Sequence, residues 1–370
     1  MGDVSGRPSV GKQSRQTRSP HEFIGSFPAR GTHNFSRARF RAGRRSDAGA
    51  FLVQTCSAAR APVFIAAKGA KRKLRAADHR CRNSLTPACL SCIIPVMHSD
   101  RLHILCVGAH PDDCEFRCGG VAALWAQRGH EVCFVSMTSG GAGHHETGGA
   151  ALVQRRIREA EAAAAVIGIH SIVLPNPDGM LEPSLACRLE LIRLIRRFGA
   201  DLIITNRPND YHPDHRYTSQ LVQDSAFMLT VPQVAPDVPA LPRNPVILYW
   251  YDSFQKPAPF HCDLAIDIDP VFDNKLAMLH CHQSQVYEWL PWLAGRLGEV
   301  PADDAARKTF LRQWYEQRHK PSLADRYREQ LIVRYGRTRG RKIRQAEVFE
   351  VSEYGSALDR AAMERLFADM

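Results

Sequence analysis

The stretch "LHILCVGAHPDDCEFRCGG", residues 102–120, joins an apolar run to a cluster of histidine, aspartate and glutamate. The run 102–108 has the length and composition of a buried β-strand. The polar residues 110–115 follow it directly, and Gly119 and Gly120 would let a helix start close against a sheet. This order predicts a strand, a turn and a helix, and the turn is either a plain polar connection or a site for metal binding or proton transfer.

Similar apolar runs recur downstream and alternate with amphipathic helical stretches. Strands are predicted at 102–108, 131–138, 171–175 and 201–205, and helices at 119–129, 151–167 and 184–198. Near-continuous apolar strands separated by helices indicate a parallel sheet that is covered on both faces, with right-handed crossovers. The sequence therefore predicts a Rossmann-like three-layer α/β/α fold with a mostly parallel sheet. Further strands are expected in "PVILYWY" and "CDLAIDI", and a helix at 270–282.

The composition is typical of a soluble globular protein. The chain has 370 residues, of which 44% are hydrophobic and 24% charged. Its apolar runs are all shorter than the roughly 18 to 20 residues that span a bilayer, so no membrane association is expected. The 11 cysteines have no regular spacing, which favours reduced thiols over a disulfide framework. The expected location is the cytoplasm.

Positive charge is concentrated in the first quarter of the chain. The net charge is +11 overall, but residues 1–96 hold 18 Lys and Arg against four acidic residues, so that 97–370 carries −3. Residues 1–96 also lack sustained hydrophobic periodicity. We expect a basic, disordered extension over 1–96 and a folded domain over 97–370, and no nucleic-acid partner for that domain.

Three explanations of the extension stay open. It is a basic arm for nucleic acid, an organellar transit peptide, or upstream DNA translated from a misassigned start. The stretch "MHSDRLHILCVG", which begins at Met97, is how an α/β domain ordinarily enters its first strand. This pattern favours the misassigned start.

A second polar cluster, "NRPNDYHPDHRY" at 206–217, follows the apolar run 201–205. In open α/β sheets, ligands bind outside the carboxyl ends of the strands, so two such clusters can converge on one site. A catalytic zinc site usually takes three protein ligands from His, Asp or Glu and leaves one position for water. No GxGxxG motif follows the first strand, which disfavours a dinucleotide-dependent enzyme.

These clusters resemble the AHPDDxExxxGG and HPDH motifs of the PIG-L/LmbE family of zinc-dependent N-acetylglucosaminyl deacetylases. The resemblance extends across about 101–355 and includes "RIREAEAAAAVIG", "PDG" at 177–179, "HCHQSQ" at 280–285 and "AEVFEVSEYG". It implies a hydrolase that removes the N-acetyl group from an N-acetylglucosamine-type sugar or conjugate by attack of an activated water. It implies zinc as the metal, and Fe²⁺ also suits such ligands.

Carried over to the matching positions, the resemblance implies three metal ligands: His110, Asp113 and His215. The resemblance also implies Asp112 as the general base. This division of roles agrees with the fact that two neighbouring aspartates cannot both point at one ion in the same way. His212 would stabilise the oxyanion or donate a proton. Asp214, between the two histidines, is expected to orient an imidazole.

Three further side chains are expected near the centre. Glu115 either binds a sugar hydroxyl or caps a helix, and Arg207 either holds an anionic substrate group or faces solvent. His282 is expected to organise the surroundings of the ligands. Some members of the family place a tyrosine two residues before the catalytic histidine, where this chain has Asp210. For this reason the adjacent Tyr211 is not expected to be catalytic.

Two other functions remain open. The same centre could serve an amidase that acts on a larger thiol or sugar conjugate, or a non-catalytic protein that only binds metal or sugar. A binding protein would have no need of a general base, so the intact Asp112 favours catalysis. The expected partner is a small N-acetylated sugar or glycoconjugate, and the sequence is compatible with a homo-oligomer.

Overall fold

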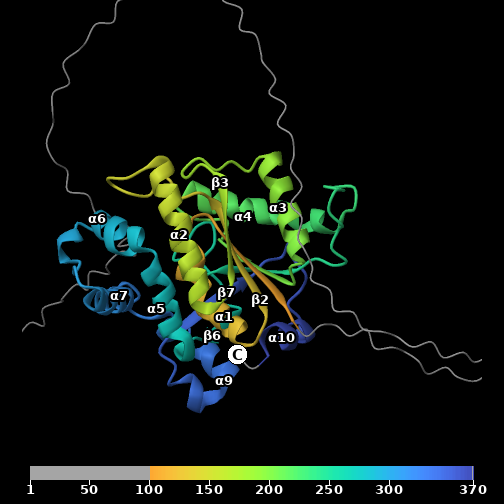
Figure 1. The fold of residues 1–370 in the computed structure, drawn as a ribbon. Helices are drawn as coiled ribbons and strands as arrows, with labels where there is room; N and C mark the ends of the chain where they lie inside the picture. Colours follow the sequence, from red (N-terminus) through yellow and green to blue (C-terminus); the bar gives the residue numbers. More distant parts are fainter. Residues whose placement is uncertain (1–100, 369) are drawn as a thin grey trace, which may run out of the picture. The chain divides into compact units, whose positions relative to one another are not determined.

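The computed structural model describes residues 101–368 and residue 370. The predicted extension over 1–96 and the domain start near Met97 lie outside the described residues, so both stay predictions. The described part contains a seven-stranded sheet in the order β3-β2-β1-β4-β5-β7-β6 (Figure 1). The strands are β1 His103–Gly108, β2 Glu131–Thr138, β3 His170–Asn176, β4 Leu202–Thr205, β5 Val246–Trp250, β6 Leu264–Asp267 and β7 Ala346–Val351.

The sheet is mostly parallel, which confirms the predicted fold class. The five strands from β3 to β5 pair in parallel, whereas β7 is antiparallel to both of its neighbours. The four strands predicted first agree with β1 to β4 to within one residue at each end. Side chains alternate across the sheet: Ile104 and Cys106 of β1 join the core on one face, and Leu105 and Val107 join the core on the other.

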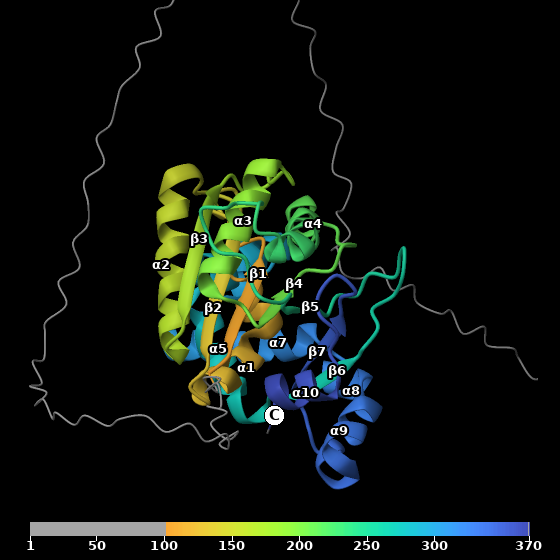
Figure 2. The same ribbon diagram turned by 90° about the vertical axis from the view of Figure 1, so that its right-hand side faces the viewer.

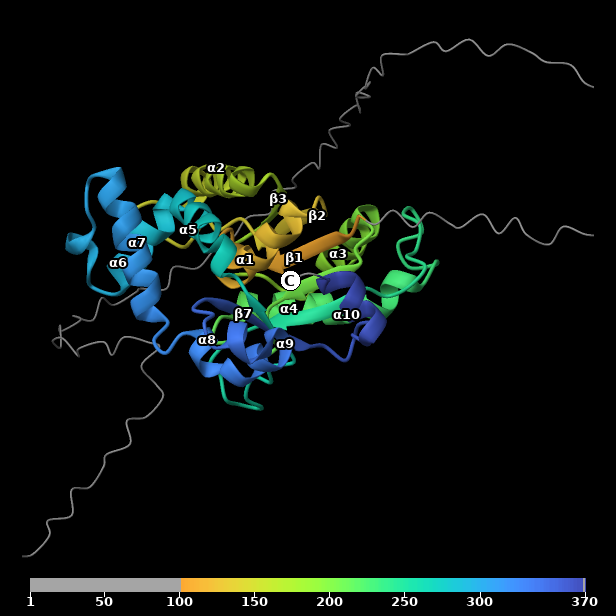
Figure 3. The same cartoon turned by 90° about the horizontal axis from the view of Figure 1, so that it is seen from below.

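Helices cover both faces of the sheet (Figures 2 and 3). One core contains side chains of α1, α2 and α5, and the other contains side chains of α3 and α4. Near β6, helices α8 and α9 pack on a third, smaller core. The helices are α1 Asp113–Gln127, α2 Gly149–Ile167, α3 Leu185–Phe198, α4 Pro213–Ala226, α5 Phe272–Cys281, α6 Leu290–Leu293, α7 Asp304–Arg318, α8 Leu323–Arg326, α9 Arg328–Gly340 and α10 Arg360–Phe367. Within the described range, none of them is both long and apolar enough to cross a membrane.

Helix α1 begins earlier than the sequence predicted. It starts at Asp113, inside the polar cluster, and not at Gly119. Acidic side chains in the first turn, here Asp113 and Glu115, are favourable beside the positive end of the helix dipole. Gly120 instead lies inside the helix, where a Cβ atom would come within 2.7 Å of Ile268. The glycine therefore allows close packing and does not start the helix.

A buried ion pair fixes α1 to the rest of the domain. Glu347 of β7 accepts hydrogen bonds from Gly120 N at 2.9 Å and Val121 N at 2.8 Å. Lys275 of α5 forms an ion pair with Glu347 and donates to Phe116 O at 2.8 Å. Lys275 is 1% exposed and Glu347 2%. These contacts hold the helix that carries Asp113 in one position against α5 and β7.

We expect Lys275→Met to lower the free energy of unfolding by about 3 to 5 kcal/mol, because it leaves the Glu347 carboxylate buried without its cation. Urea denaturation measures this change. The control is Lys308→Met, since Lys308 pairs with Asp304 at an exposed position and should change stability by less than about 1 kcal/mol. Equal stability of the two variants would show that the buried pair does not hold α1.

Candidate metal centre

The two polar clusters lie side by side at one edge of the sheet. His110 to Asp113 follow β1 and lead into α1, whereas His212 to His215 follow β4 and begin α4. Strands β1 and β4 are parallel neighbours, and the chain continues from them in opposite directions across the sheet. This reversal of strand order is where open α/β sheets bind their ligands.

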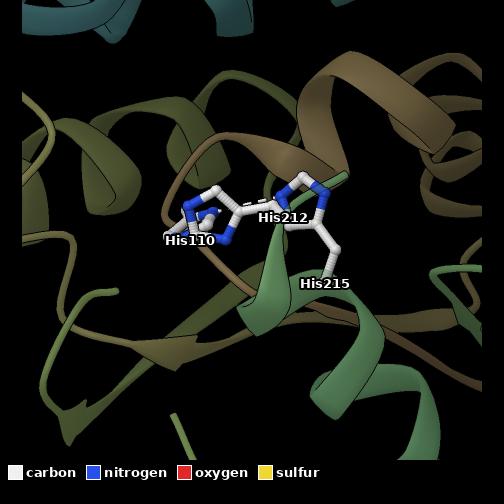
Figure 4. Close-up of side chains that lie close together, drawn as sticks. All are labelled: His110, His212 and His215. Carbon is white, nitrogen blue, oxygen red and sulfur yellow. Dashed lines mark hydrogen bonds between the residues drawn. The ribbon is translucent and has the colours of Figure 1, made fainter. Parts of the chain in front are cut away.

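The side chains of the three predicted ligands come together here. His110 Nδ1 lies 3.2 Å from His215 Nε2. Asp113 Oδ2 lies 3.6 Å from His110 Nδ1 and 3.5 Å from His215 Nε2. His212 joins them, because its ring centroid is 4.6 Å from that of His110. Figure 4 shows the three histidines, His110 from the segment after β1 and the other two from the segment at α4.

The second ring nitrogens of His110 and His215 face carboxylates. His110 Nε2 is 3.1 Å from Asp178 Oδ1 and 3.3 Å from Asp214 Oδ2, and His215 Nδ1 is 3.1 Å from Asp210 Oδ1. These carboxylates favour protons on the nitrogens that face them. The lone pairs of His110 Nδ1 and His215 Nε2 then point at each other, which is unfavourable unless a cation lies between them. Two imidazole nitrogens and a carboxylate oxygen are a donor set that fits zinc.

Charges at the centre keep Asp113 ionised. Burial favours the neutral carboxyl, but the neighbouring His215 and His110 outweigh burial and hold the pKa of Asp113 well below its ordinary value. For His110, burial opposes the charged form, but Asp113, Asp178 and Asp214 raise its pKa well above the ordinary value. A cation is thus favoured at this place, whether it is a proton or a metal ion.

Asp112 has different partners from Asp113. Its Oδ1 lies 3.0 Å from Arg156 Nη2, and Arg156 also donates to Pro111 O at 2.8 Å. Burial raises the pKa of Asp112 above its ordinary value, although Arg156 acts in the opposite direction. Its backbone has φ 156°, which non-glycine residues rarely adopt. The two aspartates therefore point to different neighbours, Asp113 to the imidazoles and Asp112 to the guanidinium.

His212 occupies the N-cap position of α4. Its Nδ1 accepts a hydrogen bond from Asp214 N at 3.2 Å. Burial lowers the pKa of His212, and the neighbouring His110 and His215 lower it further. A neutral ring that accepts at Nδ1 carries its proton on Nε2. His212 can thus present an N–H donor as a neutral side chain.

Asp214 and Asp178 connect the centre to neighbouring loops. Asp214 is fully buried and accepts hydrogen bonds from Gly179 N at 2.7 Å and Leu181 N at 3.1 Å. Asp178 accepts from Ala142 N at 2.9 Å. The sequence predicted that Asp214 orients an imidazole, and the structure places it against His110. Asp178 and Asp210 were not predicted, although Asp178 lies in the "PDG" element noticed in the sequence.

The remaining predicted residues lie in ion pairs. Glu115 Oε1 is 3.0 Å from His282 Nε2, and both side chains are buried. Arg207 is buried between Asp252, at 2.9 Å, and Glu350, at 2.8 Å. Glu115 therefore faces His282, and Arg207 neither faces solvent nor has its guanidinium free for a substrate anion.

We expect Asp210→Ala to weaken zinc affinity about 10- to 100-fold, because a carboxylate behind a metal-bound imidazole orients the ring and raises its basicity. Competition with a chromophoric chelator measures the affinity. Asp237→Ala is the matched control, since Asp237 pairs with Arg193 on the surface. Unchanged affinity in Asp210→Ala would contradict a role for Asp210 in holding His215.

The centre lies in a part of the chain that matches a known family model. Residues 105–226 match the PIG-L family model, described as GlcNAc-PI de-N-acetylase. Diacetylchitobiose deacetylase of Thermococcus kodakarensis is 26% identical over 208 residues, which cover 53% of this chain and 76% of that protein. The 4-oxalmesaconate hydratase of Pseudomonas putida is 25% identical over 205 residues, which cover 52% of this chain and 78% of that protein.

A solved structure shares the fold. The N,N'-diacetylchitobiose deacetylase from Pyrococcus horikoshii superposes with a TM-score of 0.51 at 24% identity, covering 68% of this chain and 84% of that one. The matched range 105–226 contains both polar clusters, strand β4 and the last four residues of β1. The resemblance seen in the two motifs is thereby confirmed: residues 105–226, which contain both motifs, match the PIG-L family model.

Proposed function

We propose that this protein is a metal-dependent N-deacetylase that removes the acetyl group from an N-acetylglucosamine-type sugar or conjugate. The observation that carries the proposal is the convergence of His110 Nδ1, Asp113 Oδ2 and His215 Nε2 within 3.2 to 3.6 Å of one another. Asp112 lies beside them but points to Arg156. The name of the Thermococcus kodakarensis relative, a deacetylase of diacetylchitobiose, supports this substrate class.

His110, Asp113 and His215 would hold the metal. Zinc bound there supplies Lewis acidity toward the acetamide carbonyl and lowers the pKa of a water molecule from 15.7 to about 7. The same ligands also suit Fe²⁺. Asp178, Asp214 and Asp210 keep the imidazoles oriented from behind.

Asp112 is placed to move the proton. In amide hydrolysis a water molecule loses a proton as its oxygen bonds to the carbonyl carbon, and the amine must gain one as the C–N bond breaks. A pKa raised toward neutrality suits a carboxyl that accepts the first proton and returns it to the nitrogen. The products are acetate and a primary amine, and one water is consumed.

His212 would stabilise the negative charge that develops on the carbonyl oxygen. Its Nδ1 is occupied by Asp214 N, so that Nε2 is the nitrogen that donates. The lowered pKa of His212 favours the neutral ring, and we therefore assign the stabilisation to a hydrogen bond from a neutral imidazole. A donor that is already in place when the charge develops needs no reorganisation.

The test is to load the full chain with zinc and incubate it with N-acetylglucosamine, N,N'-diacetylchitobiose and an aryl N-acetylglucosaminide. We expect amine and acetate in equal amounts, lost on treatment with a chelator and restored by zinc. If the protein instead releases an amine and an acid other than acetate from a larger thiol conjugate, it is an amidase. No release from any compound would favour a metal- or sugar-binding protein.

A hydratase is the second candidate, because the 4-oxalmesaconate hydratase of Pseudomonas putida is also a relative. Addition of water to a carbon–carbon double bond uses an activated water but releases neither amine nor acetate. The same preparation should therefore be mixed with 4-oxalmesaconate while its absorbance is followed. A decrease in absorbance, with no deacetylation of the sugars, would replace the proposed function.

A further inference from the structure

Tyr211 lies beside the histidines of the candidate metal centre, and Phe254 lies beside Tyr211. The ring centroid of Tyr211 is 5.7 Å from that of His212 and 5.8 Å from that of His215, and both contacts are close to edge-on. The ring centroid of Phe254 is 6.2 Å from that of Tyr211, and the angle between the two ring planes is 37°. Tyr211 and Phe254, together called the aromatic shelf below, thus come from the segments after β4 and β5.

The shelf is not part of the hydrophobic core. Tyr211 is 64% exposed, although it contacts two histidines of a largely buried centre. Large apolar side chains exposed next to a polar site are typical of ligand-binding surfaces. Tyr211 therefore keeps much of its surface open to a ligand that reaches the centre.

Both rings are carried by segments that hydrogen bonds hold in place. Arg216 Nη1 donates to Tyr211 O at 3.1 Å. Phe254 N donates to Asp252 Oδ1 at 2.9 Å, and the same oxygen accepts from Arg207 Nη1 at 2.9 Å. Arg207, a residue of the second polar cluster, therefore helps to hold the segment that carries Phe254. Rings that are ordered before binding lose little conformational entropy when a ligand stacks on them.

We propose that the aromatic shelf binds a ring linked to the acetylated sugar, either a second pyranose or an aryl aglycone. The inference rests on the proposed function, since it takes the acetamide to lie at His110, Asp113 and His215. Aromatic side chains stack on flat or apolar ring faces. A free monosaccharide has no ring beyond the one that carries the acetamide, so the shelf would select conjugates over N-acetylglucosamine.

The experiment compares kcat/KM for N-acetylglucosamine, N,N'-diacetylchitobiose and phenyl N-acetyl-β-glucosaminide. In Tyr211→Ala and Phe254→Ala we expect the ratio of conjugate to monosaccharide to fall about 3- to 10-fold. Tyr211→Phe should keep the ratio, because the ring face does the binding and the hydroxyl does not. Whether disaccharide or aryl glycoside loses more identifies the natural ring.

Phe227→Ala is the matched control. Phe227 is also an exposed aromatic, 70% accessible, but it follows the other end of α4, about 20 Å from Tyr211 along the helix. Its removal should leave all three kcat/KM values unchanged. Ratios that stay constant in both alanine variants would overturn the inference, as would a loss in Tyr211→Phe equal to that in Tyr211→Ala, which would indicate a role for the hydroxyl.

A binding measurement separates failure of the shelf from failure of the proposed function. Phenyl β-glucosaminide has the aryl ring but no acetyl group, so calorimetry follows its binding without turnover. Tyr211→Ala should weaken its Kd about 3- to 10-fold and Phe227→Ala should not. If Tyr211→Ala weakens binding and Phe227→Ala does not, but no acetylated sugar is turned over, the deacetylase is rejected and the ring-binding role of the aromatic shelf stands. Absence of binding by the unmodified protein would reject the shelf.

Discussion

Asp112→Asn is expected to lower turnover of an N-acetylated sugar by about 10² to 10⁴, the usual contribution of a general base. The amide has nearly the same volume as the carboxyl but cannot accept a proton from water. The atoms of His110, Asp113 and His215 that converge face one another, whereas Asp112 Oδ1 faces Arg156, so the proposed metal site should be kept. Steady-state release of amine measures the effect.

The control for this substitution is Asp237→Asn, a surface carboxylate paired with Arg193. It should turn over at the rate of the unmodified protein. If Asp112→Asn keeps metal and full activity, Asp112 is not the base, and the proton must move through another group.

His215→Ala should abolish metal binding and activity together. The substitution removes one of the three proposed ligands, and the two that are left, His110 and Asp113, belong to a single turn. The fold should persist, because His215 lies in the first turn of α4 at the edge of the sheet. A ligand that binds only the folded state stabilises it. Zinc should therefore raise the Tm of the unmodified protein but not that of the variant.

His261→Ala serves as the comparison, since the His261 side chain is exposed and pairs with nearby Asp263. Its Tm should rise with zinc as it does for the unmodified protein. A zinc-dependent rise in His215→Ala, together with remaining activity, would show that the metal is held by other residues.

The sequence predicted the parallel half of the sheet because each strand there is a continuous apolar run. Antiparallel β7 was not predicted, although its segment was quoted from the tail "AEVFEVSEYG". Its partners β5 and β6 come about 80 to 100 residues earlier in the chain, and no local signal gives the direction of such a pairing. The start of α1 was misplaced by six residues, because Gly119 and Gly120 also serve for packing inside a helix.

The residues of the centre were predictable because they cluster within two short motifs. The carboxylates that face the second nitrogens of the imidazoles were not predicted, apart from Asp214. Asp178 reaches His110 from the loop after β3, and Asp210 was noticed only as the position of an absent tyrosine. For Arg207, the sequence offered two interpretations, but the residue instead pairs with Asp252 and with Glu350, 143 positions further along the chain. Such pairings depend on which strands are neighbours, which local spacing does not contain.

The two adjacent aspartates, Asp112 and Asp113, are proposed to have different tasks, one as the base and the other as a metal ligand. The most direct measurement is the zinc content of Asp112→Asn and Asp113→Asn, purified side by side and analysed by elemental mass spectrometry. Because Asp113 Oδ2 lies beside the two imidazole nitrogens and Asp112 Oδ1 lies on Arg156, Asp112→Asn should keep about one zinc per chain and Asp113→Asn should lose most of it. An empty Asp112→Asn beside a fully loaded Asp113→Asn would contradict the assignment of ligand and base.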